Sequence, residues 1–207
     1  MLRLRPLSGA WRRNRLSSTK GVKMRGLRKI GAAVRINGLR SGVLCLLLLC
    51  GWTAAPQGTG PGPAIGASTK LPVPRFVSLR SAEVNFRAGP GFQYPVIWTY
   101  ERDGLPVEVI GEFAVWRHVL APDGGTGWVH EALLRARRTF IVTVPQARLR
   151  GSPRADAGIV AYLDKGVVGI LLACDSDSAY CRVSAAHETG YLARADFWGA
   201  FPGETVK

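Results

Sequence analysis

The sequence predicts an all-β protein made of two small barrels in tandem, preceded by a signal peptide and a flexible linker. Two observations carry this prediction. From about residue 71, short segments of alternating apolar and polar residues follow one another, and turn-forming residues interrupt them roughly every 8–12 residues. Four blocks of residues also recur in the same order at a nearly constant interval. Such periodicity indicates a duplicated structural unit.

The repeated blocks lie 62–64 residues apart. The first pair of blocks has an arginine before a turn, and the second begins with glycine and continues as an apolar strand. The third pair begins with an aromatic residue, and the fourth consists of a glycine, an aromatic residue and an aliphatic residue. A duplicated small module that carries no catalytic cluster favours binding over catalysis. The paired blocks are residues 85–90 and 148–153, 104–109 and 166–171, 116–119 and 180–183, and 127–129 and 190–192.

We expect two folded units, over residues 71–137 and 138–203, each close to the lower size limit for independent folding. Residues 139–144 are expected to form the strand that joins them as they pack together. Single helical turns are expected at 131–134 and 194–197, and no longer helix is predicted. The expected strands are 83–87, 96–100, 106–112, 115–120 and 127–130 in the first unit, and 148–150, 160–163, 167–173, 180–183 and 190–192 in the second.

Residues 1–55 hold most of the excess positive charge. Twelve of the 28 Lys and Arg residues and none of the 14 acidic residues lie there, so 16 basic residues face 14 acidic ones in the rest of the chain. A nearly neutral body has no large field to hold a polyanion, which argues against nucleic acid as a partner. The basic stretch, the apolar run 43–50 and small residues up to Ala55 come in the order of a secretory signal peptide.

The apolar run is too short to span a bilayer, so we expect no stable membrane span after cleavage and a periplasmic or secreted protein. Residues 56–70, rich in Gly, Pro, Ser and Thr, predict a flexible linker. Three alternatives exist for the leader: a start at Met24, an organelle transit peptide, and lipoprotein processing at Cys50. The Leu-rich run favours secretion, and the bulky Leu49 disfavours lipoprotein processing.

Cys174 and Cys181 lie outside the leader and flank a polar, turn-rich stretch between two apolar runs. This pattern predicts a hairpin in which the two cysteines face each other within disulfide range. In an oxidising compartment we expect them to be bonded. A redox-active pair is an alternative, weakened because the spacing is not Cys-x-x-Cys and no Lys or His lies nearby. A metal site is weaker still, because a second pair of ligands is missing.

The motifs resemble those of the bacterial SH3-like domain over nearly all of residues 71–203. The resemblance rests on Asn-Phe-Arg-x-Gly-Pro at 85–90, Gly-x-Pro-Val at 104–107, Trp-Arg-x-Val at 116–119 and Gly-Trp-Val at 127–129. It is closest to the tandem, secreted, stand-alone form of alphaproteobacteria. It implies two SH3-like β-barrels and extracytoplasmic binding of cell-wall peptide or glycan, often beside hydrolase domains.

The second repeat departs from the pattern of that family. Leu149 stands where the motif has Phe, Ser152 interrupts Gly-Pro, and Tyr191 replaces Trp. A site carried over from the family is therefore expected in the first repeat, with the second in a supporting role.

Aromatic residues of the first repeat are the first candidates for ligand binding, because exposed rings stack on sugars or grip an extended peptide. Phe92 and Tyr94 follow a Gly-Pro-Gly turn, and loop aromatics tend to be exposed. Trp98, Trp116 and Trp128 are further candidates, although Trp116 and Trp128 alternate with apolar neighbours and favour the core.

Arg87, shared with the second repeat as Arg150, is the next candidate, because a guanidinium can hold a peptide carboxylate. An ion pair with Glu108 or Glu112 that fixes the loop is the more favoured alternative. His118 and His130 could lie on adjacent strands, but two ligands do not make a zinc site.

The rest of the chain outside the leader shows no serine nucleophile motif, and its acidic pairs sit in turns. The sequence therefore predicts no enzyme activity, cofactor or metal. It predicts a non-catalytic module that binds cell-wall peptide or glycan, or an envelope protein, in the periplasm or outside the cell. The alternatives are a structural scaffold for protein–protein interaction and a thiol protein that uses Cys174 and Cys181.

Overall fold

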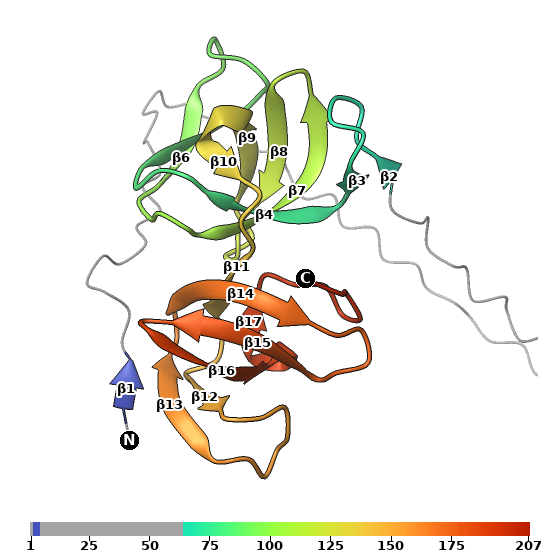
Figure 1. Ribbon diagram of the computed structural model, residues 1–207. Helices are drawn as coiled ribbons and strands as arrows, with labels where there is room; N and C mark the ends of the chain where they lie inside the picture. Colours follow the sequence, from blue (N-terminus) through green and yellow to red (C-terminus); the bar gives the residue numbers. More distant parts are fainter. Residues whose placement is uncertain (1, 5–63) are drawn as a thin grey trace, which may run out of the picture. The chain divides into compact units, whose positions relative to one another are not determined.

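The computed structural model describes residues 2–4 and 64–207, which form β-strands, loops and two short 3-10 turns (Figure 1). The predicted all-β class is confirmed. The predicted cleavage site, Met24, Cys45 and Cys50 lie outside the described residues. No helix in the described part of the chain is long and apolar enough to cross a membrane.

Barrel one is a seven-stranded sheet with the order β10-β4-β7-β8-β9-β5-β6 (Figure 1). Its neighbouring strands are antiparallel, and a 3-10 turn, η1 (Glu131–Leu133), precedes the last strand. The strands are β4 (Arg75–Leu79), β5 (Val84–Arg87), β6 (Val96–Tyr100), β7 (Pro106–Phe113), β8 (Trp116–Leu120), β9 (Thr126–His130) and β10 (Leu134–Arg135).

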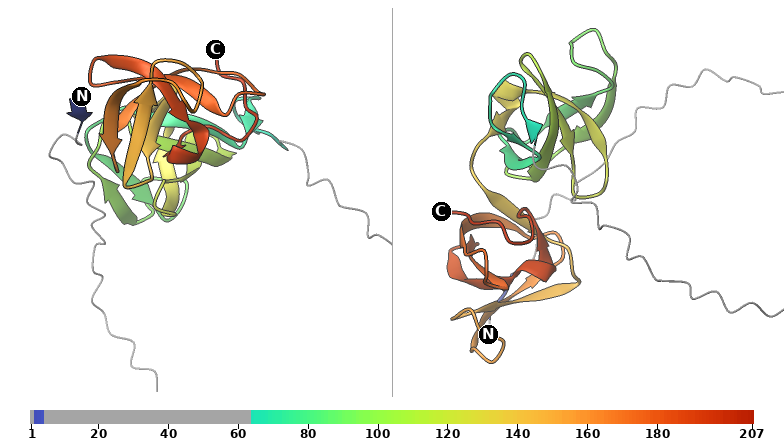
Figure 2. Two further views of the ribbon diagram at one scale, coloured as in Figure 1. Left: turned by 90° about the horizontal axis from the view of Figure 1, so that it is seen from below. Right: turned by 90° about the vertical axis from the view of Figure 1, so that its right-hand side faces the viewer.

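Barrel two repeats this topology strand for strand, with the order β13-β12-β16-β15-β14-β11-β17. Two further views show each unit curling round on itself (Figure 2). The 3-10 turn η2 (Arg194–Asp196) precedes the last strand, as η1 does in barrel one. The strands are β11 (Thr139–Val142), β12 (Gln146–Arg150), β13 (Ile159–Asp164), β14 (Val168–Cys174), β15 (Tyr180–Ala185), β16 (Glu188–Ala193) and β17 (Phe197–Trp198).

The duplication extends to local irregularities and close contacts. The register shifts between Phe86 and Arg87 in barrel one, and between Leu149 and Arg150 in barrel two. A Cβ added to Gly127 would lie 2.7 Å from the Phe86 Cβ, and one added to Gly190 would lie 2.6 Å from the Arg150 carbonyl oxygen. These close approaches of neighbouring strands explain why both repeats carry glycine before the aromatic residue.

Each barrel closes around its own apolar core. Strand alternation points one set of side chains inward, as in β12, where Ala147 and Leu149 are buried and their neighbours are not. The core of barrel one includes Phe86 and Tyr100, whose ring centroids lie 4.4 Å apart. Ile141 of β11 also belongs to this core, although β11 pairs with strands of barrel two.

The hairpin of β14 and β15 holds the disulfide. Cys174 and Cys181 are directly opposed in the register and joined by a disulfide bond, with both side chains buried. The sequence prediction of a bonded pair across a hairpin is confirmed.

Part of the stretch predicted as a flexible linker is folded. β2 (Ala64–Ile65) pairs with β3 (Pro72–Val73), and the turn between them lies against the carboxylate of Glu112. The main-chain N–H groups of Ser68 and Thr69 donate to this carboxylate at 3.0 and 2.9 Å. A buried carboxylate needs such donors, so it holds the turn 66–70 between the two short strands in place.

A short strand of the predicted signal peptide is also described. β1 (Leu2–Leu4) pairs in parallel with β13 and extends the sheet of barrel two by one strand. The outer edge of β13 thus accepts an extended segment.

Candidate functional site

Three rings gather on the outer surface of barrel one. Trp116 on β8 and His130 on β9 face each other in the register, and Phe92 from the loop after β5 lies against both. The Phe92 centroid is 5.0 Å from that of Trp116, edge-on, and 5.8 Å from that of His130, stacked. Phe92 is 71% exposed, whereas Trp116 is 6% exposed. We call Phe92, Trp116 and His130 the aromatic platform.

Arg87 fixes the loop that carries Phe92. Its Nη1 donates to the main-chain oxygens of Phe92 at 3.2 Å and of Tyr94 at 2.9 Å, and its guanidinium lies 5.5 Å from the Phe92 centroid. The favoured ion pair of Arg87 with Glu108 or Glu112 is absent from the described structure, and Glu112 bonds instead to Arg75 at 2.7 Å. Arg87 therefore orders the loop through main-chain oxygens rather than through a carboxylate.

Tyr94 packs back onto its own loop. A Cβ on Gly89 would lie 2.5 Å from the Tyr94 ring, so the ring covers the backbone at that position. The side chain is nevertheless 40% exposed. The glycine of the Gly-Pro-Gly turn thus lets an aromatic ring seat against the main chain.

Trp128 forms a second stacked pair on the same outer surface. It faces His118 in the register of β8 and β9, and the two centroids lie 5.0 Å apart. Arg87 pairs with Trp128 across β5 and β9, which links this pair to the platform. Burial beside the tryptophan lowers the pKa of His118 below its usual value, so the imidazole is neutral at pH 7.

Trp98 is the candidate that the structure separates from the others. It lies opposite the buried Phe86 in the register and packs, partly buried, against the core of barrel one. Paired residues of neighbouring strands share a face, so Trp98 lies on the inner side, whereas Arg87 and Trp128 point outward. Within residues 64–207, no group of three metal-binding side chains comes together around His118, His130 or any other site.

One residue of this surface escaped the sequence interpretation as a site residue. His130 reads in the sequence as a single surface histidine, yet it completes the platform. The available signal was its position two residues after Trp128, which places both side chains on the same face of one strand. Phe113, at the end of β7, faces Trp116 in the register and is 59% exposed. It extends the apolar surface beside the platform.

Comparison with known proteins agrees with this geometry. Residues 80–136 match the family model of the bacterial SH3 domain, a span that contains β5 to β10 and therefore the whole aromatic platform. No curated protein matches the sequence. The resemblance seen in the motifs is thereby confirmed for barrel one.

Two solved structures are similar to the chain at a low level. NlpC2 from Trichomonas vaginalis is 15% identical, with a TM-score of 0.28, and the alignment covers 60% of this chain and 48% of that one. NlpC1 from the same organism is 18% identical, with a TM-score of 0.28, covering 67% of this chain and 51% of that one. The chain spans about half the length of these proteins.

Residues 80–136 are a bacterial SH3 domain, which is a class of binding module. Barrel two repeats the same strand order, so the chain carries two SH3-like barrels in tandem.

Proposed function

We propose that the protein is a non-catalytic, extracytoplasmic binding module for a cell-wall peptide or glycan, and that the aromatic platform is its contact surface. The observation that carries this proposal is the 71% exposure of Phe92 on top of a packed Trp116 and His130. A large ring held in place while facing solvent loses little conformational entropy when it binds a ligand.

The surroundings of Phe92 suit an amphipathic ligand. Sugar rings and extended peptides both present apolar faces beside polar groups, and an aromatic ring stacks on such faces. The imidazole of His130 lies under the ring, and the guanidinium of Arg87 lies near it. The stacked His118 and Trp128 continue the surface along the same two strands. An extended peptide would follow this line of rings.

The proposed location outside the cytoplasm rests on two features. The Cys174–Cys181 disulfide is typical of oxidising compartments. The basic, apolar and small-residue order of residues 1–55 predicts export. Together they favour the periplasm or the cell exterior, where a wall ligand is accessible.

An envelope protein is the second candidate ligand, favoured by a specific observation. Phe113 and Val115, which are 59% and 42% exposed, lie at the β7–β8 turn next to Trp116. With Phe92 and Tyr94 they place four exposed apolar side chains around one side of barrel one. An apolar surface of this kind also fits a protein partner.

Sedimentation of the purified protein with isolated peptidoglycan tests the proposal. Phe92→Ala should weaken sedimentation about tenfold or more, because truncating a central aromatic anchor commonly costs 2 kcal/mol or more. Ile65→Ala is the matched control, since Ile65 is 64% exposed and lies on β2, which contributes no residue to the platform. The control should sediment like the unmodified protein.

The outcomes separate the two candidates. Sedimentation that Phe92→Ala abolishes and Ile65→Ala leaves intact supports a wall-binding platform. If the unmodified protein stays in solution at low salt, the wall proposal is wrong, and crosslinking in the envelope then tests the protein partner. If both variants sediment equally well, the ligand lies elsewhere on the chain.

A further inference from the structure

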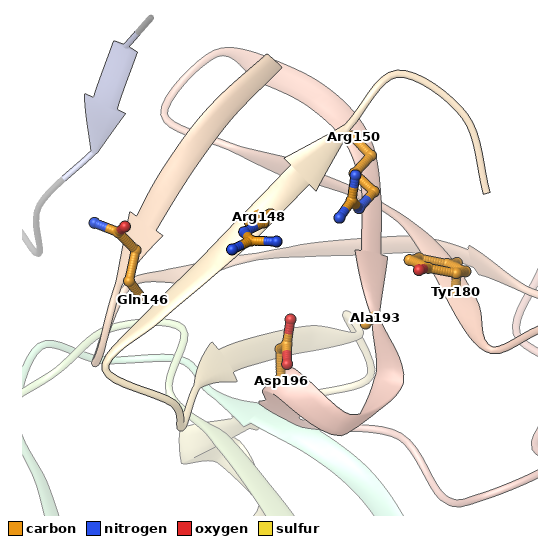
Figure 3. Close-up of a pocket in the computed structure, with 6 residues that line it drawn as sticks. All are labelled: Gln146, Arg148, Arg150, Tyr180, Ala193 and Asp196. Atoms are coloured by element: carbon orange, nitrogen blue, oxygen red, sulfur yellow. The ribbon is translucent and has the colours of Figure 1, made fainter. Parts of the chain in front are cut away.

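Barrel two has a polar pocket at the place that the aromatic platform occupies in barrel one. The pocket measures about 290 Å³. It lies between β12, the start of β15, the end of β16 and the turn η2 (Figure 3). The residues that line it are Gln146, Arg148, Arg150, Tyr180, Ala193 and Asp196.

The strand registers show that the two places are equivalent. Trp116 faces His130 across β8 and β9 in barrel one, and Tyr180 faces Ala193 across β15 and β16 in barrel two. Arg87 faces Trp128 in the first barrel, as Arg150 faces Tyr191 in the second.

Smaller side chains open the site in barrel two. The loops after β5 and β12 have the same length, because β6 begins at Val96 and β13 at Ile159, each nine residues after its arginine. Ala155 therefore corresponds to Phe92, and Ala193 corresponds to His130. Of these two alanines, Ala193 lines the pocket, so a methyl group stands there where barrel one has the ring of His130.

Positive charge lines one side of this cavity. Arg148 and Arg150 alternate with the buried Ala147 and Leu149 along β12, so both arginines point outward. Arg150 uses one Nη1 hydrogen bond, 2.8 Å long, to hold the carbonyl oxygen of Ala157. Within the described residues, the side chain of Arg148 donates no hydrogen bond. Its guanidinium is available to a ligand.

Asp196 faces the arginines from η2. Figure 3 shows its carboxylate directed toward β12, with Tyr180 at the side of the same space. Partial burial raises the pKa of Asp196, against the attraction of Arg148 and Arg150. No described group donates a hydrogen bond to the carboxylate, which leaves an acceptor beside the two guanidinium groups.

We propose that this pocket binds the C-terminal carboxylate of a peptide. Arg148 and Arg150 donate to the ligand carboxylate, since guanidinium groups match the geometry of that anion. Tyr180 offers an O–H donor, and Asp196 accepts the N–H of the last peptide bond. A simple anion such as phosphate fits less well, because it has no donor to offer Asp196 and meets its negative charge.

This site goes beyond the proposed function, because it lies on the other barrel and its test requires no cell wall. A negative result in the peptidoglycan experiment therefore does not contradict the proposed carboxylate pocket. Its own failure leaves the platform of barrel one untouched.

The test is an NMR titration of the ¹⁵N-labelled protein with the tripeptide Ala-Ala-Ala, its C-terminal amide and inorganic phosphate. The free acid should shift the amide signals of residues 146–150, 180 and 193–196 in a saturable way. The C-terminal amide should bind at least about tenfold more weakly, because a charge-assisted hydrogen bond is lost. Phosphate should also bind at least about tenfold more weakly, because Asp196 repels the anion.

Two charge-matched variants identify the site. Arg148→Gln should weaken binding of the free acid about tenfold or more. Arg182→Gln should leave it unchanged, because Arg182 is exposed on β15 and does not line the pocket. The chemical shifts of both variants outside β12 and β15 report whether the fold is kept.

Several outcomes overturn the proposal. The proposal is wrong if the free acid causes no saturable shifts, or if the acid and the amide bind with equal affinity. It is also wrong if phosphate binds as tightly as the peptide, or if Arg148→Gln and Arg182→Gln lose the same affinity for the free acid. Asp196→Asn adds a further check. It should weaken tripeptide binding and strengthen phosphate binding, whereas parallel changes for both ligands contradict the assigned role of Asp196.

Discussion

Arg87 and Arg150 make the same main-chain contact in the two barrels, 63 residues apart. Nη1 of Arg87 donates to the Tyr94 oxygen at 2.9 Å, and Nη1 of Arg150 donates to the Ala157 oxygen at 2.8 Å. Each arginine stands directly after a register shift that bends its strand. The shared arginine is therefore a loop clamp in both repeats, whatever residues the loop presents to a ligand.

Removing the clamp from barrel one should loosen the platform without unfolding the barrel. In Arg87→Gln, we expect faster amide hydrogen exchange in residues 88–95 and weaker binding at Phe92, because the loop no longer holds one conformation. The loss of global stability should stay near 1 kcal/mol, the typical value of such hydrogen bonds. Arg80→Gln is the control, since Arg80 is exposed outside the loop. Unchanged amide exchange in Arg87→Gln would contradict the role of Arg87 in holding the loop.

The Cys174–Cys181 disulfide should act as a staple for its hairpin. Replacing both cysteines with serine should lower the free energy of unfolding by about 2 kcal/mol, the value for so short a loop. Urea denaturation measures this difference. Both cysteines are buried, at 1% and 0% exposure.

A thiol protein would behave differently. Its disulfide would exchange readily with dithiothreitol in the native state, which quantification of free thiols would detect. We expect the native disulfide to resist such exchange until the hairpin unfolds.

The alternation and repeat pattern predicted most strands because both are properties of the chain itself. The four repeated blocks anticipated β5, β7, β8 and β9 and their counterparts. Strands that depend on distant partners were missed. β4 (Arg75–Leu79) follows a proline-rich stretch, and β10 (Leu134–Arg135) has only two residues, so neither shows an alternating signal.

The candidate site was predictable in composition but not in arrangement. Loop position indicated that Phe92 and Tyr94 are exposed, and the structure places them so. No sequence signal tells which face of a short strand Trp98 occupies, because the register shift between Phe86 and Arg87 decides it. The pocket of barrel two could not be predicted for another reason: it includes Ala193, which stands where barrel one has a histidine ring and carries no chemistry of its own.

Glu112 makes the stability of the fold sensitive to acid. Its side chain is fully buried and accepts hydrogen bonds from Thr69 Oγ1 at 2.6 Å and from Arg75 Nη2 at 2.7 Å. Burial alone would raise its pKa, but these bonds and those from the main chain of Ser68 and Thr69 lower the pKa from 4.5 to about 2. Because the folded pKa lies below the unfolded one, this stabilisation is present above pH 4.5 and is lost as the pH falls toward 2.

Glu112→Gln should therefore remove part of the acid dependence. We expect the variant to be less stable at pH 7 by on the order of 3 kcal/mol, because Arg75 loses a buried partner. Its denaturation midpoint should change less than that of the unmodified protein between pH 4.5 and 2. Glu83→Gln, at an exposed position, should follow the unmodified protein. Identical pH profiles for Glu112→Gln and the unmodified protein would rule out this role.

Phe76 of β4 should couple the unfolding of the two barrels. Its ring is 5% exposed. The ring lies 4.7 Å from the centroid of Trp198, which belongs to β17, and 4.6 Å from that of Phe201, which follows β17. The guanidinium of Arg138 lies 5.6 Å from the ring. Truncating a buried phenylalanine costs about 3–5 kcal/mol. Phe76→Ala should therefore weaken the contact between β4 and β17 as well as the stability of barrel one.

We therefore expect scanning calorimetry to show a single transition for the unmodified protein. Phe76→Ala should show two resolved transitions, with barrel one melting first. Barrel two should keep the higher transition because its core and disulfide are unaffected. Phe113→Ala, the loss of an exposed ring, should leave a single transition. A single transition at an unchanged temperature for Phe76→Ala would mean that Ile141, which joins β11 to the core of barrel one, suffices for the coupling.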